Sequence, residues 1–191
     1  MKRSLTLLVA AAALTSLLIL SAINSSAADR AAKPAFNSAP TDYCTQTGGA
    51  VKVRRPAYGT NGGHPLPLSG LRQFCTYTAD DTSRIHILVD TLFTPRPTLA
   101  SLAYYAQVQP LGNCSGNPAS CYCSQLGGSD LFGGINAAGG GWVLKGDIDE
   151  TLEACIFPDQ SSIDSWGLFY HSAGIVRGID LSTVLVYQNP F

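Results

Sequence analysis

The chain has 191 residues, of which 13% are charged, and its formal net charge is −1 at pH 7. This balance excludes the strongly basic proteins that bind nucleic acid through an excess of Lys and Arg. The 19 glycines and 11 prolines favour a fold rich in loops over a bundle of long helices.

The first 28 residues have the three parts of an export signal. Two basic residues precede an apolar segment over residues 5–22, and small side chains follow at Ser26 and Ala28. We expect a signal peptide over residues 1–28, cleavage after Ala28, and no membrane-spanning segment in the mature protein. An uncleaved anchor is the alternative, because the apolar segment is nearly long enough to span a bilayer. Residues 29–39 lack any hydrophobic period, and we expect a flexible N-terminus there.

The predicted mature part contains an even number of cysteines. They are Cys44, Cys75, Cys114, Cys121, Cys123 and Cys155. Such a number in an exported chain is typical of a disulfide framework. A zinc site formed by Cys114, Cys121 and Cys123 with a histidine is the alternative, but the export signal favours disulfides.

Two segments of the mature chain have similar sequences, which indicates an internal repeat. Residues 43–49 read Tyr-Cys-Thr-Gln-Thr-Gly-Gly, and residues 122–128, displaced by 79 positions, read Tyr-Cys-Ser-Gln-Leu-Gly-Gly. In each copy 30 or 31 residues separate the cysteine of the segment from a later cysteine. We therefore expect an α+β fold with a first module over residues 40–108 and a second over residues 109–191. Each would be a small disulfide-stapled module with a short helix, antiparallel strands and a second helix.

The repeat also predicts the disulfide pairing, since equivalent cysteines should form equivalent bridges. Cys121 and Cys123 are two positions apart in a predicted helix, so their side chains point in different directions and need separate partners. Cys123 takes the partner that the repeat assigns to it, which leaves Cys121 for Cys114. We expect the pairs Cys44–Cys75, Cys114–Cys121 and Cys123–Cys155.

In the first module, the pattern predicts a short helix over residues 40–47, with Gly48 and Gly49 after it. Strands are expected near residues 50–55, 71–78 and 84–90, and a helix over residues 98–106.

In the second module, Asn117 and Pro118 predict the start of a helix, and Gly127 and Gly128 its end. The further elements are strands at residues 142–144 and 154–157, a helix from Ser161 or Ser162 to near Gly174, and a last strand within residues 175–187. Ile163, Trp166 and Tyr170 fall on one face of this second helix, which is typical of a core stripe rather than a ligand platform.

The motifs of the second module resemble a known family. They are Asn-Pro-Ala-Ser-x-Tyr-Cys-x-x-x-Gly-Gly at residues 117–128, Ala-Cys-Ile-Phe-Pro-Asp at residues 154–159, and Trp-Gly-Leu-Phe-Tyr at residues 166–170. This pattern is similar to the short exported bacterial modules of unknown function that are labelled hemolysins. The resemblance implies two tandem copies, the first degenerate, and a secreted or cell-envelope location, but no established activity. The chain has Gln160 where the family tends to have glycine.

None of the three histidines stands in a catalytic motif, and the chain lacks the Gly-x-Ser-x-Gly motif of a nucleophile elbow. His64 precedes a proline in a glycine-rich loop. His86 alternates with isoleucines, which predicts the outer face of a strand. His171 closes the last helix, where a positive charge suits the helix dipole. We therefore predict no catalytic residues.

Binding sites for ions and cofactors are not predicted either. The acidic residues Asp147, Asp149, Glu150 and Glu153 lack the glycine and the remote acid of a calcium loop, so a solvated hairpin tip is the simpler interpretation. Residues 133–141 are rich in glycine but are not followed by the Lys-Ser or Lys-Thr of a phosphate-binding loop.

Charge is distributed unequally between the two predicted modules. Residues 29–108 carry a balance of +3, and residues 109–191 a balance of −6. Docking of the two modules is the simplest explanation, and a charged partner at one face is the alternative. The basic positions Lys52, Arg54 and Arg55 are expected at the solvated edge of a strand.

The sequence thus predicts a non-catalytic, secreted or periplasmic protein with a binding or structural role. Its partner is expected in the envelope or outside the cell, with no role for nucleic acid, a metal or a cofactor. A secreted enzyme inhibitor is one alternative, because stapled modules present rigid loops. A secreted hydrolase without a recognisable motif is another.

Overall fold

The computed structural model describes residues 37–189, apart from residues 63, 64, 113, 115, 131–138, 145 and 146, and only the backbone of residues 62 and 147–150. The predicted signal peptide, most of the predicted flexible N-terminus and His64 lie outside the described residues.

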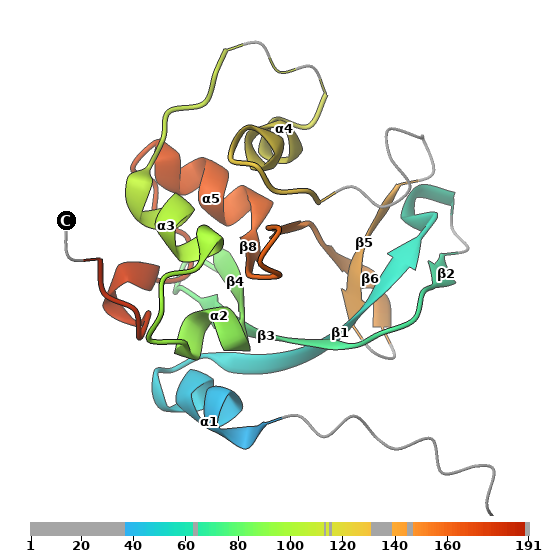
Figure 1. Cartoon of the computed structure of the whole chain (residues 1–191). Coiled ribbons are helices and arrows are strands. Elements are labelled where there is room, and N and C mark those ends of the chain that lie inside the picture. Colours follow the sequence, from blue (N-terminus) through green and yellow to red (C-terminus); the bar gives the residue numbers. More distant parts are fainter. Residues whose placement is uncertain are drawn as a thin grey trace, which may run out of the picture. The chain divides into compact units, whose positions relative to one another are not determined.

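The described residues form five helices and eight strands, with two runs of four strands separated by three helices; Figure 1 shows their arrangement. The first half contains α1 (Ser38–Gln46), β1 (Ala50–Tyr58), the 3₁₀ turn η1 (Thr60–Gly62), β2 (Leu66–Pro67), β3 (Arg72–Thr78), β4 (Arg84–Leu88), α2 (Val89–Phe93) and α3 (Leu99–Ala106). The second half contains α4 (Pro118–Gln125), β5 (Gly140–Leu144), β6 (Asp147–Leu152), β7 (Ala154–Ile156), β8 (Ser162–Asp164), α5 (Ser165–Ser172) and the 3₁₀ turn η2 (Leu181–Thr183). The fold is α+β, as predicted.

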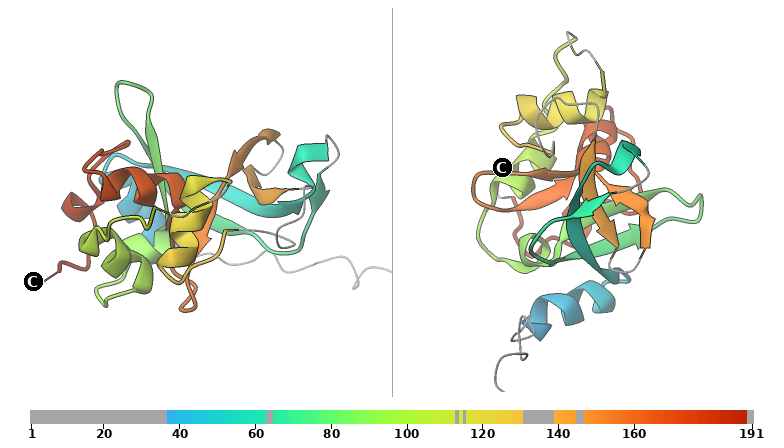
Figure 2. Two further views of the ribbon diagram at one scale, coloured as in Figure 1. Left: turned by 90° about the horizontal axis from the view of Figure 1, so that it is seen from above. Right: turned by 90° about the vertical axis from the view of Figure 1, so that its right-hand side faces the viewer.

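All eight strands belong to one antiparallel sheet with the order β6-β5-β1-β3-β4-β8-β7, in which β2 pairs with β1. The two end strands follow each other in the chain with only Glu153 between them, so the sheet curls back almost into a barrel. Strands from the two predicted modules pair directly, β5 with β1 and β8 with β4. Figure 2 shows this curved sheet from two sides.

Local sequence signals set the helix ends. The Asn117 side chain accepts hydrogen bonds from the backbone of Ala119 and Ser120 at the start of α4, and Pro118 is its first residue. Gly48 and Gly127 follow α1 and α4 with positive φ angles of 88° and 85°. Glycine adopts this conformation without steric cost, so it ends both helices as predicted.

The three predicted disulfides are confirmed, because Cys44–Cys75, Cys114–Cys121 and Cys123–Cys155 are all bonded. The two long-range bridges are fully buried and lie in the same hydrophobic core. A glycine packs directly against each of them. A Cβ atom added at Gly49 would lie 2.3 Å from Cys75 Sγ, and one added at Gly128 would lie 2.4 Å from Cys155 Sγ.

The two long-range disulfides occupy equivalent places in the sheet. Cys75 of β3 faces Ile87 of β4, and Cys155 of β7 faces Ile163 of β8. Ile87 and Ile163 in turn face each other where β4 meets β8. The strands that flank the central pair β4–β8, namely β3 and β7, thus each carry a cysteine that is bonded to a helix. The helix is α1 for β3 and α4 for β7, and these helices contact α2 and α5 respectively.

Three expectations about local structure are wrong. Residues 162–164 form strand β8 instead of the first turn of a helix, because they pair with β7 and β4. Helix α5 starts at Ser165 and is capped by Asp164, not by Ser161 or Ser162. Residues 175–187 form no strand, since Asp180 caps the turn η2 and directs the apolar side chains that follow into the core.

The basic run does not lie at an edge of the sheet as expected, although Lys52 is exposed. β1 lies in the middle of the sheet, between β3 and β5. Arg54 has no exposed surface, and its guanidinium donates to the carbonyl oxygen of Trp142 at 3.1 Å.

Candidate functional site

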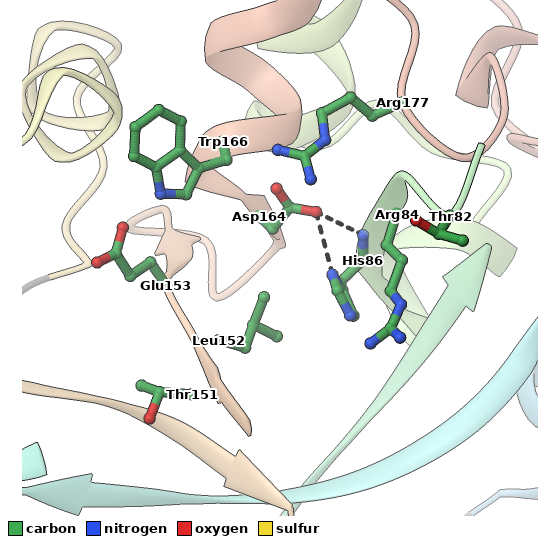
Figure 3. Close-up of a pocket in the computed structure, with 9 residues that line it drawn as sticks. All are labelled: Thr82, Arg84, His86, Thr151, Leu152, Glu153, Asp164, Trp166 and Arg177. Atoms are coloured by element: carbon green, nitrogen blue, oxygen red, sulfur yellow. Dashed lines mark hydrogen bonds and ion pairs between the residues drawn. The ribbon is translucent and has the colours of Figure 1, made fainter. Parts of the chain in front are cut away.

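A cleft of about 420 Å³ opens where β4 meets β8, and it is bounded by the end of β6 and by the loop after α5 (Figure 3). Its lining comes from both predicted modules. β4 and the turn before it contribute Thr82, Arg84 and His86, whereas Asp164, Trp166 and Arg177 come from β8, α5 and the loop that follows. The junction of the two halves therefore forms the cleft.

Asp164 and His86 form the floor of this cleft. Asp164 Oδ2 accepts a hydrogen bond from the backbone N–H of His86 at 2.6 Å and lies 3.3 Å from His86 Nδ1. The other carboxylate oxygen accepts from the backbone of Gly167 and so caps α5. Only 6% of the Asp164 side chain and 10% of the His86 side chain are exposed. This carboxylate therefore ties β4 to the start of α5.

The position expected for His86 is wrong, since the ring does not face solvent as the alternation with isoleucine suggests. β8 pairs with β4, and Asp164 at the end of β8 covers the ring. The long-range pairing of two strands buries a side chain that local alternation places outside.

Arg177 lines the cleft from the loop after α5. Its guanidinium points toward Asp164 and Trp166 (Figure 3) and lies 5.0 Å from the ring centre of Tyr170. In the part of the chain that the structure describes, Arg177 forms no hydrogen bond and no ion pair within 4 Å. Its five N–H donors remain available to a ligand.

The acidic groups of the cleft are used internally. Both oxygens of Asp164 accept hydrogen bonds from the backbone. Glu153 Oε2 accepts from the side-chain amide of Asn117 at 2.8 Å, which links the cleft to the cap of α4. Neither acid forms an ion pair with Arg177 among the described residues, so its guanidinium remains available to a ligand.

Thr82 at the rim of the cleft has an unusual backbone conformation. Its φ angle is 68°, in the left-handed region that a β-branched residue rarely adopts. Such conformations cluster at binding and catalytic sites, where the surrounding structure holds them in place. Thr82 is kept there by the β3–β4 turn, in which its N–H donates to the carbonyl of Ala79 at 2.9 Å.

The expected core stripe on the last helix is partly wrong. Ile163 is fully buried, but it belongs to β8, while Trp166 and Tyr170 are only half-buried. The face of α5 that enters the core carries Leu168 and His171 instead. Because α5 starts at Ser165, Ile163 does not belong to it and does not mark its buried face, and Trp166 lines the cleft.

His171 lies away from the cleft, in the last turn of α5 as expected. Its ring stacks on Tyr104 with 3.7 Å between ring centres, and its Nε2 is 2.9 Å from Gln107 Nε2. Burial lowers the pKa of His171, although the charge of Asp180 opposes this effect. Burial likewise raises the pKa of Tyr104. These contacts place His171 in the core.

The cysteines cannot form the zinc site weighed from the sequence, because all six are bonded as disulfides. The side chains of Asp147, Asp149 and Glu150 lie outside the described residues, as does most of the glycine-rich segment 133–141. Among the described residues, no group of His, Cys, Asp and Glu is arranged to hold a metal ion, and no helix combines the length and hydropathy needed to cross a bilayer.

Sequence reasoning missed the cleft residues Thr82, Arg84 and Arg177. None of them stands in a motif, and a pairing between strands about 75 positions apart brings them together.

Comparison with known protein families, curated proteins and solved structures gives no match for this chain.

Proposed function

We propose that this protein is an exported, non-catalytic binding protein, built from two copies of one disulfide-stapled module, whose junction cleft takes a small ligand with an anionic group. The observation that carries the proposal is the guanidinium of Arg177, which points into the cleft and has no hydrogen-bond partner among the described residues.

The equivalent places of the two long-range disulfides support the two-copy origin. Both bridges connect a helix to a strand next to the central pair β4–β8, and both are packed against a glycine that follows the helix. The separations within the two pairs, 31 and 32 residues, are also nearly equal. One module alone would supply only half of the cleft, so the ligand site would be a product of the duplication.

An anionic ligand fits the charges that the cleft presents. Arg pairs with carboxylate and phosphate groups through two parallel hydrogen bonds. The half-buried indole of Trp166 adds a flat apolar wall against which a ring can stack. The ligand class that combines both features is a small aromatic carboxylate or phosphate.

Export is supported by the three disulfides, which persist in oxidising compartments. The N-terminal signal pattern and the resemblance to exported bacterial modules favour the same location. The resemblance does not indicate a ligand, and the proposed ligand class is inferred from the residues of the cleft.

Calorimetric titration of the mature protein with benzoate and phenyl phosphate tests the proposal. We expect binding of at least one probe and a loss of affinity of roughly tenfold or more in Arg177→Gln, since charged hydrogen bonds are lost. The matched control is Arg96→Gln, which removes an exposed arginine outside the cleft. Equal affinities in both variants, or no binding to the wild type, would contradict the proposed site.

A hydrolase is the second candidate, and the His86–Asp164 pair favours it. A carboxylate that orients a histidine is the arrangement of a general base in many hydrolases. Hydrolysis of ester or glycoside substrates by the wild type, lost in His86→Gln while the fold is retained, would support this candidate over the binding protein.

An enzyme inhibitor is favoured by the shape of the β3–β4 hairpin, which projects from the body of the protein (Figure 2). Two hydrogen bonds brace its tip: Ala79 N–H donates to the carbonyl of Ser83, and Ser83 N–H donates to Asp81 Oδ1, both at 2.9 Å. Inhibition of a panel of secreted proteases, abolished by shortening the tip, is the measurement that would favour this candidate.

A further inference from the structure

A second cavity of about 470 Å³ lies between the segment after α4, strand β5 and the turn after β7. Its volume is in the range of small-molecule sites, about 300–1,000 Å³. The residues that matter for its chemistry are Arg72, Asp130, Trp142 and Phe157. Among the described residues, none lines both this cavity and the junction cleft.

Asp130 is an acidic group with an unmet hydrogen-bonding capacity. The side chain is buried, with 5% of the residue exposed. Its Oδ2 accepts a hydrogen bond from Ser165 Oγ at 2.5 Å, whereas its Oδ1 has no partner. A buried oxygen without a donor is costly, so a donor supplied by a ligand would stabilise it.

Arg72 lines the same cavity. Its guanidinium lies 5.5 Å from the ring centre of Trp142. It donates to Gln160 at the carbonyl oxygen (3.2 Å) and at Oε1 (2.7 Å). Those bonds use two of the five N–H donors, and no carboxylate lies within 4 Å of Arg72 among the described residues.

We propose that this cavity binds a small zwitterion, namely an α-amino acid with an apolar side chain. The ammonium group would donate to Oδ1 of Asp130, and the carboxylate would accept from the free donors of Arg72. The apolar side chain would lie against the indole of Trp142 and against Ile156, which also lines the cavity. A buried acid and a cation without a carboxylate partner in one apolar cavity match the two charges of such a ligand.

Two simpler occupants explain less of the geometry. A buried water could satisfy Asp130 Oδ1, but it would not use the donors that Arg72 presents at the same cavity. A metal ion needs several oxygen, nitrogen or sulfur ligands, and Asp130 is not part of any such group among the described residues. An organic ammonium needs only one carboxylate.

The test is calorimetric titration of the mature protein with leucine, N-acetyl-leucine and leucinamide. We expect leucine to bind. Each analogue lacks one of the two charges, and its affinity should be lower by roughly tenfold or more. Asp130→Asn keeps the shape of the side chain and should weaken leucine binding by a similar factor. The matched control Asp80→Asn, at an exposed acid outside the cavity, should leave it unchanged.

The two tryptophans of the chain give a readout that needs no variant, because Trp142 lines this cavity and Trp166 lines the junction cleft. In ¹⁵N–¹H spectra of the wild type, leucine should shift the indole signal of Trp142 and leave that of Trp166 in place. Equal binding of leucine and N-acetyl-leucine would overturn the inference. So would an unshifted Trp142 signal at millimolar leucine, which is the result expected if the cavity holds only water. Either result leaves the separate test of the junction cleft unaffected.

Discussion

The glycines that contact the two long-range disulfides give a quantitative prediction. In Gly128→Ala, the new Cβ would lie 2.4 Å from Cys155 Sγ and 2.9 Å from Cys123 Sγ. Heavy atoms in contact are ordinarily about 3.5–4.0 Å apart, so the sulfur atoms would have to move by roughly 1 Å. Gly49→Ala creates the same conflict with Cys75 and Cys44, at 2.3 and 2.9 Å.

The expected cost follows from these distances. Overpacking a well-packed core costs about 1–3 kcal/mol, and the reduced entropy of the unfolded chain returns about 0.4–1 kcal/mol. Both disulfides are fully buried and cannot move aside, so we expect a net loss of roughly 2 kcal/mol for each variant. In a domain of this size, this loss lowers the melting temperature by about 4–8 °C.

Urea unfolding of the oxidised protein is the assay, and Gly112→Ala is the matched control, because its Cβ would meet no atom within 4 Å. In the background Cys123→Ala/Cys155→Ala the sulfur atoms are absent, so the cost of Gly128→Ala should largely disappear. A cost within about 0.5 kcal/mol of the Gly112→Ala control, or a cost at only one of the two equivalent glycines, would refute the reasoning.

Three further predictions concern stability. Replacing both cysteines of the 123–155 bridge by alanine should cost about 4 kcal/mol of unfolding free energy, and the 114–121 bridge about 2 kcal/mol, because their separations are 32 and 7 residues; chemical denaturation that ranks them in the opposite order would contradict this. Because burial lowers the pKa of His171, the unfolded chain binds more protons below pH about 6.5, so the unfolding free energy should fall as the pH drops from there through the native pKa. His171→Phe, which preserves stacking on Tyr104, should remove that slope in unfolding measured between pH 7 and 5, and an unchanged slope would assign it to another group. Asp159 accepts from the N–H of Leu99 at the start of α3, so Asp159→Ala should cost roughly 1–2 kcal/mol. Burial alone would raise the pKa of Asp159, but hydrogen bonds from Ser161 and Leu99 outweigh it and lower the pKa. The contribution of Asp159 to the unfolding free energy is therefore lost as the pH falls from 3.8 through the native pKa. In acid titration the unfolding free energies of wild type and variant should converge.

Features encoded by neighbouring residues could be predicted from the sequence. Asn117, Pro118 and Gly127 act within one or two turns of α4, so the start and the end of that helix follow from local chemistry. The disulfide pairing could be predicted because the repeat shows which cysteines of the two halves are equivalent.

Features that depend on long-range pairing could not be predicted in the same way. Arg54 stands in a polar run, yet pairing of β1 with both β3 and β5 buries it. Ser162 looks like a helix cap, yet it belongs to β8. Arg177 stands in a loop without a motif, and it reaches the cleft only because β8 and α5 pack beside β4.

The indole signals of the two tryptophans test most directly whether an anionic ligand binds at the junction of the two halves. We predict that titration of the ¹⁵N-labelled mature protein with benzoate shifts the indole signal of Trp166, which lines the cleft, and leaves that of Trp142 unchanged. In Arg177→Gln the shift of Trp166 should require a much higher concentration of benzoate. A spectrum in which Trp166 does not respond, or responds equally in Arg177→Gln, would contradict the account.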